Sequence, residues 1–191
     1  MALNGKELGA NLALHYNSAS SKNNAAELET ELKQKHPNLK VAIYQGDLTS
    51  AATVDKLFDS VLKDFGMIDI VVNTVGKVLK KPITDISEEE YDSMLAINSK
   101  AALFILKAAA RHISDDGKII TIVTALLGTF TGFYTSYAGS KVLVEHFTRG
   151  VLEGIAGAAS FFYPQESPEA VEFHKSNGMG NRLTMVQEMH Q

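Results

Sequence analysis

The sequence predicts an α/β fold built on a parallel β-sheet that helices cover on both faces. Two observations predict it. Up to Arg149, short and nearly continuous apolar segments alternate with longer amphipathic ones. Apolar strands of this kind are buried on both faces, which is typical of parallel sheets joined by helical crossovers. With 191 residues the chain has the size of one domain, so we expect residues 1–191 to form a single domain.

The strands are predicted from short runs of apolar and β-branched residues. Such residues fit a pleated, buried surface better than polar ones do. A turn at Gly46-Asp47 and another at Asp115–Gly117 separate two of these runs from their neighbours. The predicted strands are residues 11–16, 41–44, 68–73 and 118–124.

The helices are predicted from apolar residues at helical spacing and from capping residues. Ser87 and Glu90 form a capping-box pattern, and Gly66 is placed to end a helix. After Gly150 the apolar residues follow no clear period, and the predicted helices end there. These helices run from Ser20 or Ser21 to before Pro37, from Thr49 or Ser50 to Gly66, from Ser87 through Ala109, and over 135–149.

Composition excludes several classes of protein. The net charge is −4, from 18 basic and 22 acidic residues, so we expect no nucleic-acid partner. The apolar run 101–110 is too short to span a bilayer, and residues 1–9 lack the apolar core of a signal peptide. We therefore expect a cytoplasmic protein with no membrane partner. There are no cysteines, and the six histidines show no paired spacing, so no metal site is expected.

Tyr137 and Lys141 carry the strongest chemical signal. They are four positions apart on a predicted helix, so their side chains share one face. A free tyrosine has a pKa of about 10, too high for proton transfer at neutral pH, and a neighbouring positive charge lowers it. The pair is therefore a candidate general acid/base. A core tyrosine beside a solvated lysine is the alternative that this spacing alone leaves open.

Polar residues that follow the predicted strands support the chemical interpretation. Thr124 lies at the end of one strand, Asn73 ends another, and Asp47 follows a third. Ligands of open parallel sheets bind beyond the carboxyl ends of the strands. A hydroxyl such as that of Thr124 could hydrogen-bond a substrate oxygen there.

Taken together, these residues resemble the short-chain dehydrogenase/reductase superfamily over roughly residues 7–149. The resemblance implies a Rossmann-like, doubly wound parallel sheet in three αβα layers, incomplete in this sequence. It also implies an oxidoreductase that interconverts a carbonyl and an alcohol. The matching features are Asp47-Leu48, Asn73-Thr74-Val75-Gly76 in place of the family's Asn-Asn-Ala-Gly, Asn98 in the long helix, Thr124, and Tyr137-x-x-x-Lys141.

The resemblance implies a role for each matched residue. Tyr137 would exchange the proton with the substrate oxygen, and Lys141 would lower the tyrosine pKa and hold the nicotinamide ribose. Thr124, where the family usually has serine, would orient the substrate oxygen, and Asn98 would support a water-linked proton path. In addition, Asp47 and Leu48 would face the adenine, and the backbone of Asn73–Gly76 would flank the cofactor.

The residues after the first predicted strand predict the choice of cofactor. A carboxylate at this place would bind the ribose 2′-hydroxyl of NAD and repel the 2′-phosphate of NADP. The segment Tyr16-Asn17-Ser18-Ala19-Ser20-Ser21-Lys22 has no acid, and its hydroxyls, amide and lysine suit a phosphate. We therefore predict NADP as the cofactor in preference to NAD.

The sequence has no counterpart for three elements of the family. The first strand and its Thr-Gly-x-x-x-Gly-x-Gly turn would fall between Lys6 and Glu7, and two more strands would follow Gly150. Loss of the first strand, which lies mid-sheet, would leave backbone groups on the strands 11–16 and 68–73 without partners. Either stretches of a longer chain are omitted, or the chain is a truncated, non-catalytic relative that serves as a binding or subunit-assembly module.

The resemblance finally implies a homodimer or homotetramer. Helices within 91–111 and 135–149 would form the contact between subunits. Small residues on the first of these helices would permit close approach: Ala101, Ala102, Ala108 and Ala109.

Overall fold

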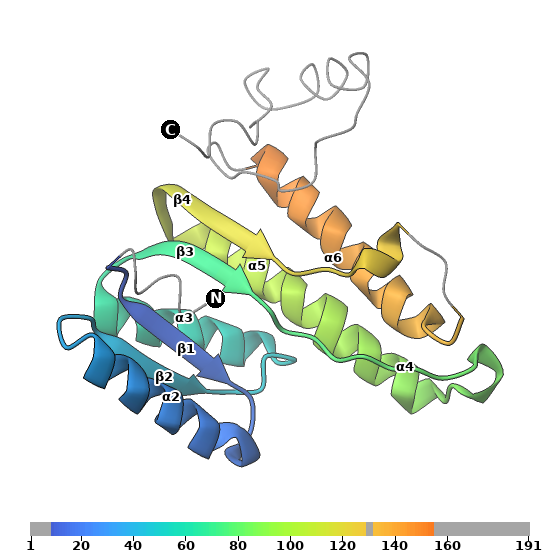
Figure 1. Cartoon of the computed structure of the whole chain (residues 1–191). Helices are drawn as coiled ribbons and strands as arrows, with labels where there is room; N and C mark the ends of the chain where they lie inside the picture. The colour runs from blue at the N-terminus through green and yellow to red at the C-terminus, as the bar shows by residue number, and fades with distance from the viewer. Residues whose placement is uncertain (1–8, 129–131, 155–191) are drawn as a thin grey trace. The chain divides into compact units, whose positions relative to one another are not determined.

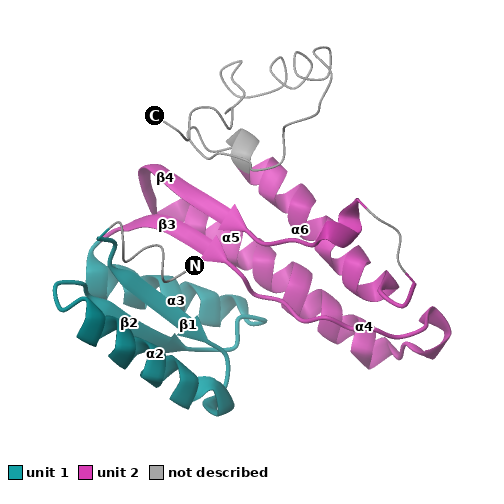
Figure 2. Cartoon of the chain, viewed as in Figure 1, with its two compact units in different colours: residues 1–66 teal, residues 67–191 magenta. Residues whose placement is uncertain are grey.

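The computed structural model describes residues 9–128 and 132–154, with the side chains of 152–154 left out (Figure 1). The chain divides into two compact units, Met1–Gly66 and Met67–Gln191 (Figure 2). Within the described residues, each unit contains one sheet of two parallel strands. The predicted α/β class with parallel strands is confirmed, in a partial form.

The first unit contains two β-strands, each followed by a helix. Strands β1 (Leu12–Tyr16) and β2 (Val41–Gln45) pair in parallel, with Tyr16 opposite Gln45. Helix α2 (Lys22–Lys35) joins them, and α3 (Ala51–Phe65) follows β2. Gly66, at φ 84°, ends α3 as predicted, because this left-handed conformation suits glycine. The core of this unit is formed by Leu32, Val41, Leu48, Val54 and Phe58.

The second unit packs its helices on the other strand pair. Strands β3 (Ile68–Asn73) and β4 (Ile113–Thr121) run parallel, and helix α5 (Ala101–His112) packs against both of them and against α6 (Thr135–Gly154). Figure 1 shows α5 running along the back of this strand pair. The alanines at 101, 102, 108 and 109 are all buried inside this unit. The prediction that they face another subunit is therefore wrong, because the small side chains serve packing within the chain.

One continuous helical run, Glu88–His112, crosses the second unit. It consists of α4 (Glu88–Met94), a π-helical segment (Leu95–Lys100) and α5. The capping box predicted for Ser87 and Glu90 is present at its start. By length and composition this run could cross a membrane, but half of its most apolar window is buried inside the structure. We interpret it as a core helix, since such helices have the same composition.

The bounds of β4 and α6 differ most from the prediction. Strand β4 begins at Ile113 and includes the predicted turn, which forms an irregularity in the pairing with Asp116 at φ 61°. It ends at Thr121, so Thr124 lies beyond the strand and not at its end. Helix α6 continues to Gly154, because a helix packed on its neighbours needs no strict apolar period in its last turn.

The described strands do not form one continuous sheet. Among the described strands, β1 pairs with β2 and β3 pairs with β4. The absence of a counterpart for the family's first strand stays a prediction from the sequence. Lys6 and Glu7, the consecutive residues between which that strand would fall, lie outside the described residues.

Candidate active site

The loop after β3 is held at its start by Asn73. This side chain is buried, and its Oδ1 accepts a hydrogen bond from the backbone N–H of Val75 at 3.0 Å. The Asn73 carbonyl accepts another from Ile122 N–H at 2.9 Å, which joins the loop to the segment after β4. The loop therefore leaves the sheet in a fixed direction, at the carboxyl ends of both strands.

Lys141 reaches this place from helix α6. Its Nζ donates hydrogen bonds to the carbonyls of Val75 and Ile122, both at 3.2 Å, and the residue is only 4% exposed. None of the ion pairs in the described part of the chain includes it. Burial lowers the pKa of the Lys141 ammonium from its ordinary value, because the charged form loses hydration. The structure thus places the Lys141 amino group at the ends of β3 and β4.

Asn98 connects the π-helical segment to both the loop and α6. Its Oδ1 accepts from the backbone N–H of Lys77 at 2.8 Å, while its Nδ2 donates to the Lys77 carbonyl at 2.9 Å. The same Nδ2 donates to Ser140 Oγ at 2.9 Å, and Ser140 Oγ donates to the carbonyl of Tyr137 at 2.7 Å. Asn98 is fully buried. Asn98 therefore forms a bracket, that is, a set of hydrogen bonds that joins the loop 73–77 to the helix that carries Tyr137.

Gly76 lies where these groups converge. A Cβ at this position would meet Asn98 Oδ1 and Lys141 Nζ, each at 2.9 Å. Real Cβ atoms are almost never so close to other heavy atoms. The position therefore leaves no room for a side chain, because the backbone at Gly76 lies close to Lys141 and Asn98.

We expect Gly76→Ala to displace Lys141 and Asn98, because the new methyl group would lie 2.9 Å from Lys141 Nζ and from Asn98 Oδ1. Overpacking of this kind also costs about 1–3 kcal/mol in the free energy of unfolding. Gly150→Ala is the control, since a Cβ there meets nothing within 4 Å. An alanine in a helix raises the free energy of unfolding by up to about 1 kcal/mol relative to glycine. Urea unfolding measures the free energy of unfolding of both variants. A stability of Gly76→Ala equal to that of the unmodified chain would contradict this close approach.

Thr124 caps a short turn between β4 and α6. Its Oγ1 accepts from Leu126 N–H at 3.3 Å, and a 3₁₀ turn follows over Ala125–Leu127. The Thr124 hydroxyl thus accepts a hydrogen bond within its own turn. A hydroxyl that accepts one bond can also donate its hydrogen to a further acceptor. Its predicted role toward a substrate stays a prediction.

Tyr137 lies in the first turn of α6, one turn before Lys141. Its ring packs edge to face on the ring of Tyr134, with 6.4 Å between the centroids. The residue is partly exposed, in contrast to the buried lysine. A partly exposed phenol one helical turn before a buried lysine fits the expectation of a proton donor, and the role of Tyr137 stays a prediction.

The first unit holds the other predicted site residues. Asn17 and Ser18 follow β1, and Asp47 follows β2, at the same end of the parallel pair. Gly46 N–H donates to the Tyr16 carbonyl at 3.1 Å, which links the two loops. Leu48 is buried in the core of this unit, and its predicted role toward the adenine stays a prediction.

Several residues that organise these loops had no assigned role in the sequence. The sequence offers one indication for Ser140, because it lies directly before Lys141 and three positions after Tyr137. In the first unit, His15 Nε2 lies 2.7 Å from the Gly46 carbonyl, so this nitrogen carries the hydrogen of the bond. Burial lowers the pKa of His15, which favours the neutral ring. Among the described residues, no group of three or more His, Asp or Glu side chains is placed to hold a metal ion.

Comparison with known proteins decides the family. A family model described as enoyl-(acyl carrier protein) reductase matches residues 1–153. The chain belongs to the short-chain dehydrogenase/reductase superfamily. Among the curated members, hydroxynaphthalene reductase-like protein Arp2 of Metarhizium brunneum is 36% identical over 151 residues, which are 78% of this chain and 55% of that protein. This short-chain dehydrogenase/reductase thus spans about half the length of the curated relatives it matches.

Solved structures of the superfamily support the same assignment. A dehydrogenase from Burkholderia cenocepacia, crystallised with bound NADP, is 49% identical and has a TM-score of 0.74. The match covers 87% of this chain and 67% of that one. A short-chain dehydrogenase from Oenococcus oeni is 48% identical, with a TM-score of 0.59, over 75% of this chain and 61% of the other. The predicted Rossmann-like class is therefore confirmed.

Proposed function

We propose that this chain is an NADP-dependent oxidoreductase that interconverts a small carbonyl compound and its alcohol, with Tyr137 as the general acid/base. The observation that carries the proposal is the position of Lys141. Its ammonium is buried at the ends of two parallel strands, one helical turn from a tyrosine. A buried charge with no ion pair in the described part of the chain costs free energy, and such arrangements cluster at functional sites.

The chain's own residues account for the proton chemistry. In the direction of reduction, Tyr137 gives its hydroxyl proton to the carbonyl oxygen, and the Lys141 charge stabilises the phenolate that remains. The bracket of Asn98 and Ser140 holds the backbone of Tyr137 relative to the loop 73–77. We assign Thr124 the second hydrogen bond to the substrate oxygen, as the superfamily resemblance implies.

The residues present fit a nicotinamide cofactor. The close approach at Gly76 leaves backbone, not side chain, beside Lys141, which suits a flat ring and its ribose. Lys141 donates to two carbonyls and has a third hydrogen for a ribose hydroxyl. When bound, the cofactor supplies or accepts the hydride. In the first unit, Asp47 and the backbone of Leu48 would face the adenine, and Tyr16, Asn17 and Ser18 its ribose.

We propose NADP over NAD because the turn after β1 carries no carboxylate. Asn17 is exposed there, and Ser18 and Ser20 present their hydroxyls 2.7 Å apart, just before Lys22 begins helix α2. The related Burkholderia cenocepacia dehydrogenase was crystallised with bound NADP, which supports this choice.

Asn17→Asp should shift the preference toward NAD. The new carboxylate would repel a 2′-phosphate and accept from a 2′-hydroxyl, so we expect the ratio of kcat/KM for NADPH over NADH to fall about tenfold or more. Asn24→Asp, an exposed change of the same charge in helix α2, is the control. Equal or better efficiency of the unmodified chain with NADH would refute the NADP preference.

The function is tested by hydride transfer itself. The purified chain is incubated with NADPH deuterated at the transferable position and a panel of aldehydes and ketones. We expect deuterium at the carbinol carbon of at least one product. No transfer to any carbonyl compound, together with normal folding by circular dichroism, would contradict the proposed activity.

A second candidate is the non-catalytic binding or subunit-assembly module. It is favoured by the two separate strand pairs and by the lack of a sequence match to the family's glycine-rich turn. Such a module would bind no NADPH, so a binding measurement separates the two candidates. A homodimer or homotetramer is proposed for either one, because Leu103 of α5 and Val142 and Leu143 of α6 are exposed. The cytoplasmic location and the single domain remain predictions from the sequence.

A further inference from the structure

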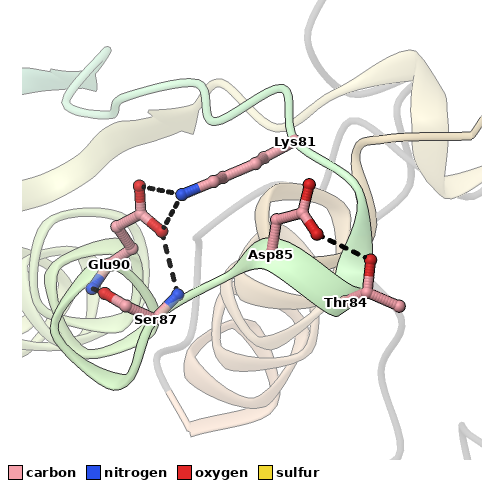
Figure 3. A network of polar contacts seen from close by, with 5 residues as sticks. All are labelled: Lys81, Thr84, Asp85, Ser87 and Glu90. Carbon is pink, nitrogen blue, oxygen red and sulfur yellow. Dashed lines mark hydrogen bonds and ion pairs between the residues drawn. The ribbon is translucent and has the colours of Figure 1, made fainter.

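A polar network outside the site connects the segment after β3 to helix α4 (Figure 3). Lys81 Nζ donates to both carboxylate oxygens of Glu90, at 2.9 and 2.8 Å. Glu90 Oε2 also accepts from the backbone N–H of Ser87 at 2.9 Å, and Glu90 N–H donates to Ser87 Oγ at 3.2 Å. The carboxylate therefore has two functions, as a helix cap and as the partner of Lys81.

The Glu90 carboxyl group is held in its charged form. The Lys81 ammonium and then the Ser87 N–H lower the pKa of Glu90 below its ordinary value. Both side chains are about one-third exposed, at 34% for Lys81 and 35% for Glu90. An ion pair with this exposure contributes little to the free energy of folding on its own. Its main effect is therefore to fix the position of the two segments that it joins.

The backbone of Lys81 continues the connection toward helix α6. Lys81 N–H donates to the carbonyl of Phe133 at 2.8 Å, although the two residues lie far apart in the sequence. Phe133 has φ 69°, in the left-handed region that a bulky side chain rarely adopts. Such a conformation persists only where the surrounding contacts fix it. The hydrogen bond from Lys81 is one such contact.

Phe133 lies directly before the residues that lead into the catalytic helix. Tyr134 follows it, and the Tyr134 carbonyl accepts from Ala138 N–H at 2.8 Å in the first turn of α6. The Tyr134 ring packs edge to face on Tyr137, and Lys80 Nζ lies 5.8 Å from the centroid of the Tyr134 ring. Two consecutive lysines thus contact two consecutive residues before α6, one through its backbone and one through its side chain.

We propose that Lys81 and Glu90 are positioning residues for Tyr137. The ion pair anchors the segment after β3 to α4, and the backbone of Lys81 then fixes Phe133 and the start of α6. The expected effect on turnover rests on the proposed oxidoreductase function, whereas the expected effect on the Lys81–Phe133 hydrogen bond does not. It assigns a specific role to Lys81, one of three lysines at 77, 80 and 81 that the sequence alone could not separate from a solvated loop.

Three variants separate the ion pair from the helix cap. Glu90→Gln keeps the capping acceptor for Ser87 N–H, because glutamine also fits a capping box, but removes the charge. Ser87→Ala is the matched control, since it removes the hydroxyl of the capping box and leaves the ion pair in place. The exchanged pair, Lys81→Glu with Glu90→Lys, restores opposite charges in reversed order.

Two readouts are measured on the full chain. Hydrogen exchange of the Lys81 amide reports on its bond to Phe133, and we expect Glu90→Gln to accelerate it about tenfold. Turnover with NADPH and a carbonyl compound that the unmodified chain reduces should show kcat lowered about tenfold and KM for NADPH unchanged. Ser87→Ala should lower thermal stability but leave kcat and the Lys81 exchange rate as they are. The exchanged pair should recover most of the lost kcat.

The outcomes are distinguishable from a failure of the proposed function. If the unmodified chain reduces no carbonyl compound, the oxidoreductase proposal fails, and the hydrogen-exchange arm alone decides this inference. Unaltered exchange of the Lys81 amide in Glu90→Gln would overturn it. In an active enzyme, an unchanged kcat in Glu90→Gln, or an equal loss of kcat in Ser87→Ala, would overturn it as well.

Discussion

Tyr137→Phe should abolish carbonyl-dependent oxidation of NADPH while the fold persists. The substitution removes the hydroxyl group that gives the proton to the substrate oxygen, and positioned acid/base groups contribute about 10²–10⁴-fold to rates. The phenyl ring keeps its edge-to-face packing on Tyr134, and Ser140 Oγ still donates to the carbonyl at this position. Steady-state kinetics on purified protein measure kcat, and circular dichroism verifies folding.

Tyr91→Phe is the matched control for this substitution. Tyr91 is 49% exposed on helix α4 and takes part in none of the contacts of the candidate site. Loss of its hydroxyl should leave kcat unchanged. Near-normal turnover in Tyr137→Phe, or an equal loss in both variants, would refute the role of Tyr137 as the proton donor.

Lys141→Met should lower kcat about 100-fold or more, because the phenolate that forms on Tyr137 loses its neighbouring positive charge. Methionine has a similar length and fills the same space without a charge. The unfolding free energy should change by less than about 1 kcal/mol, since two lost hydrogen bonds to carbonyls are offset by the removal of a buried ammonium. A large loss of stability with unimpaired kcat would instead make Lys141 a structural residue.

The dependence of stability on pH gives a second test of Lys141. Burial lowers its folded-state pKa below 10.5, so in alkaline solution the unfolded chain binds more protons at this site than the folded chain. The cost of the buried charge is full below the folded-state pKa and is relieved as the pH rises from there toward 10.5. Urea unfolding should show this stabilising contribution in the unmodified chain and not in Lys141→Met. The same pH profile in both proteins would contradict it.

The sequence predicts the elements well where local signals are strong. The apolar spacing of α3 and its end at Gly66, and the capping box of α4, agree with the structure, whereas the Ser50 side chain makes no capping hydrogen bond. The bounds of β4 and the end of α6 could not be predicted. They depend on pairing with β3 and on packing against α5, which are contacts between segments distant in the sequence.

The residues of the candidate site also divide into those that the sequence could predict and those that depend on contacts between distant segments. Asn73 and Lys141 were singled out by residue type and position, and Gly76 and Asn98 by the resemblance to the superfamily. The structure brings these four residues together. Ser140 and the Lys81–Phe133 hydrogen bond were not predicted, because they need the three-dimensional arrangement of the loop after β3 and the start of α6. The wrong assignment of the α5 alanines has a related cause, since small residues suit contacts within a chain and between chains equally well.

Fluorescence titration with NADPH tests the central claim most directly. The account predicts saturable binding to the unmodified chain, with an increase in NADPH emission and with energy transfer from the protein's tyrosines. Lys141→Met should bind more weakly because it loses the donor to the ribose. A linear, non-saturating signal from folded protein would contradict the account and favour the non-catalytic module.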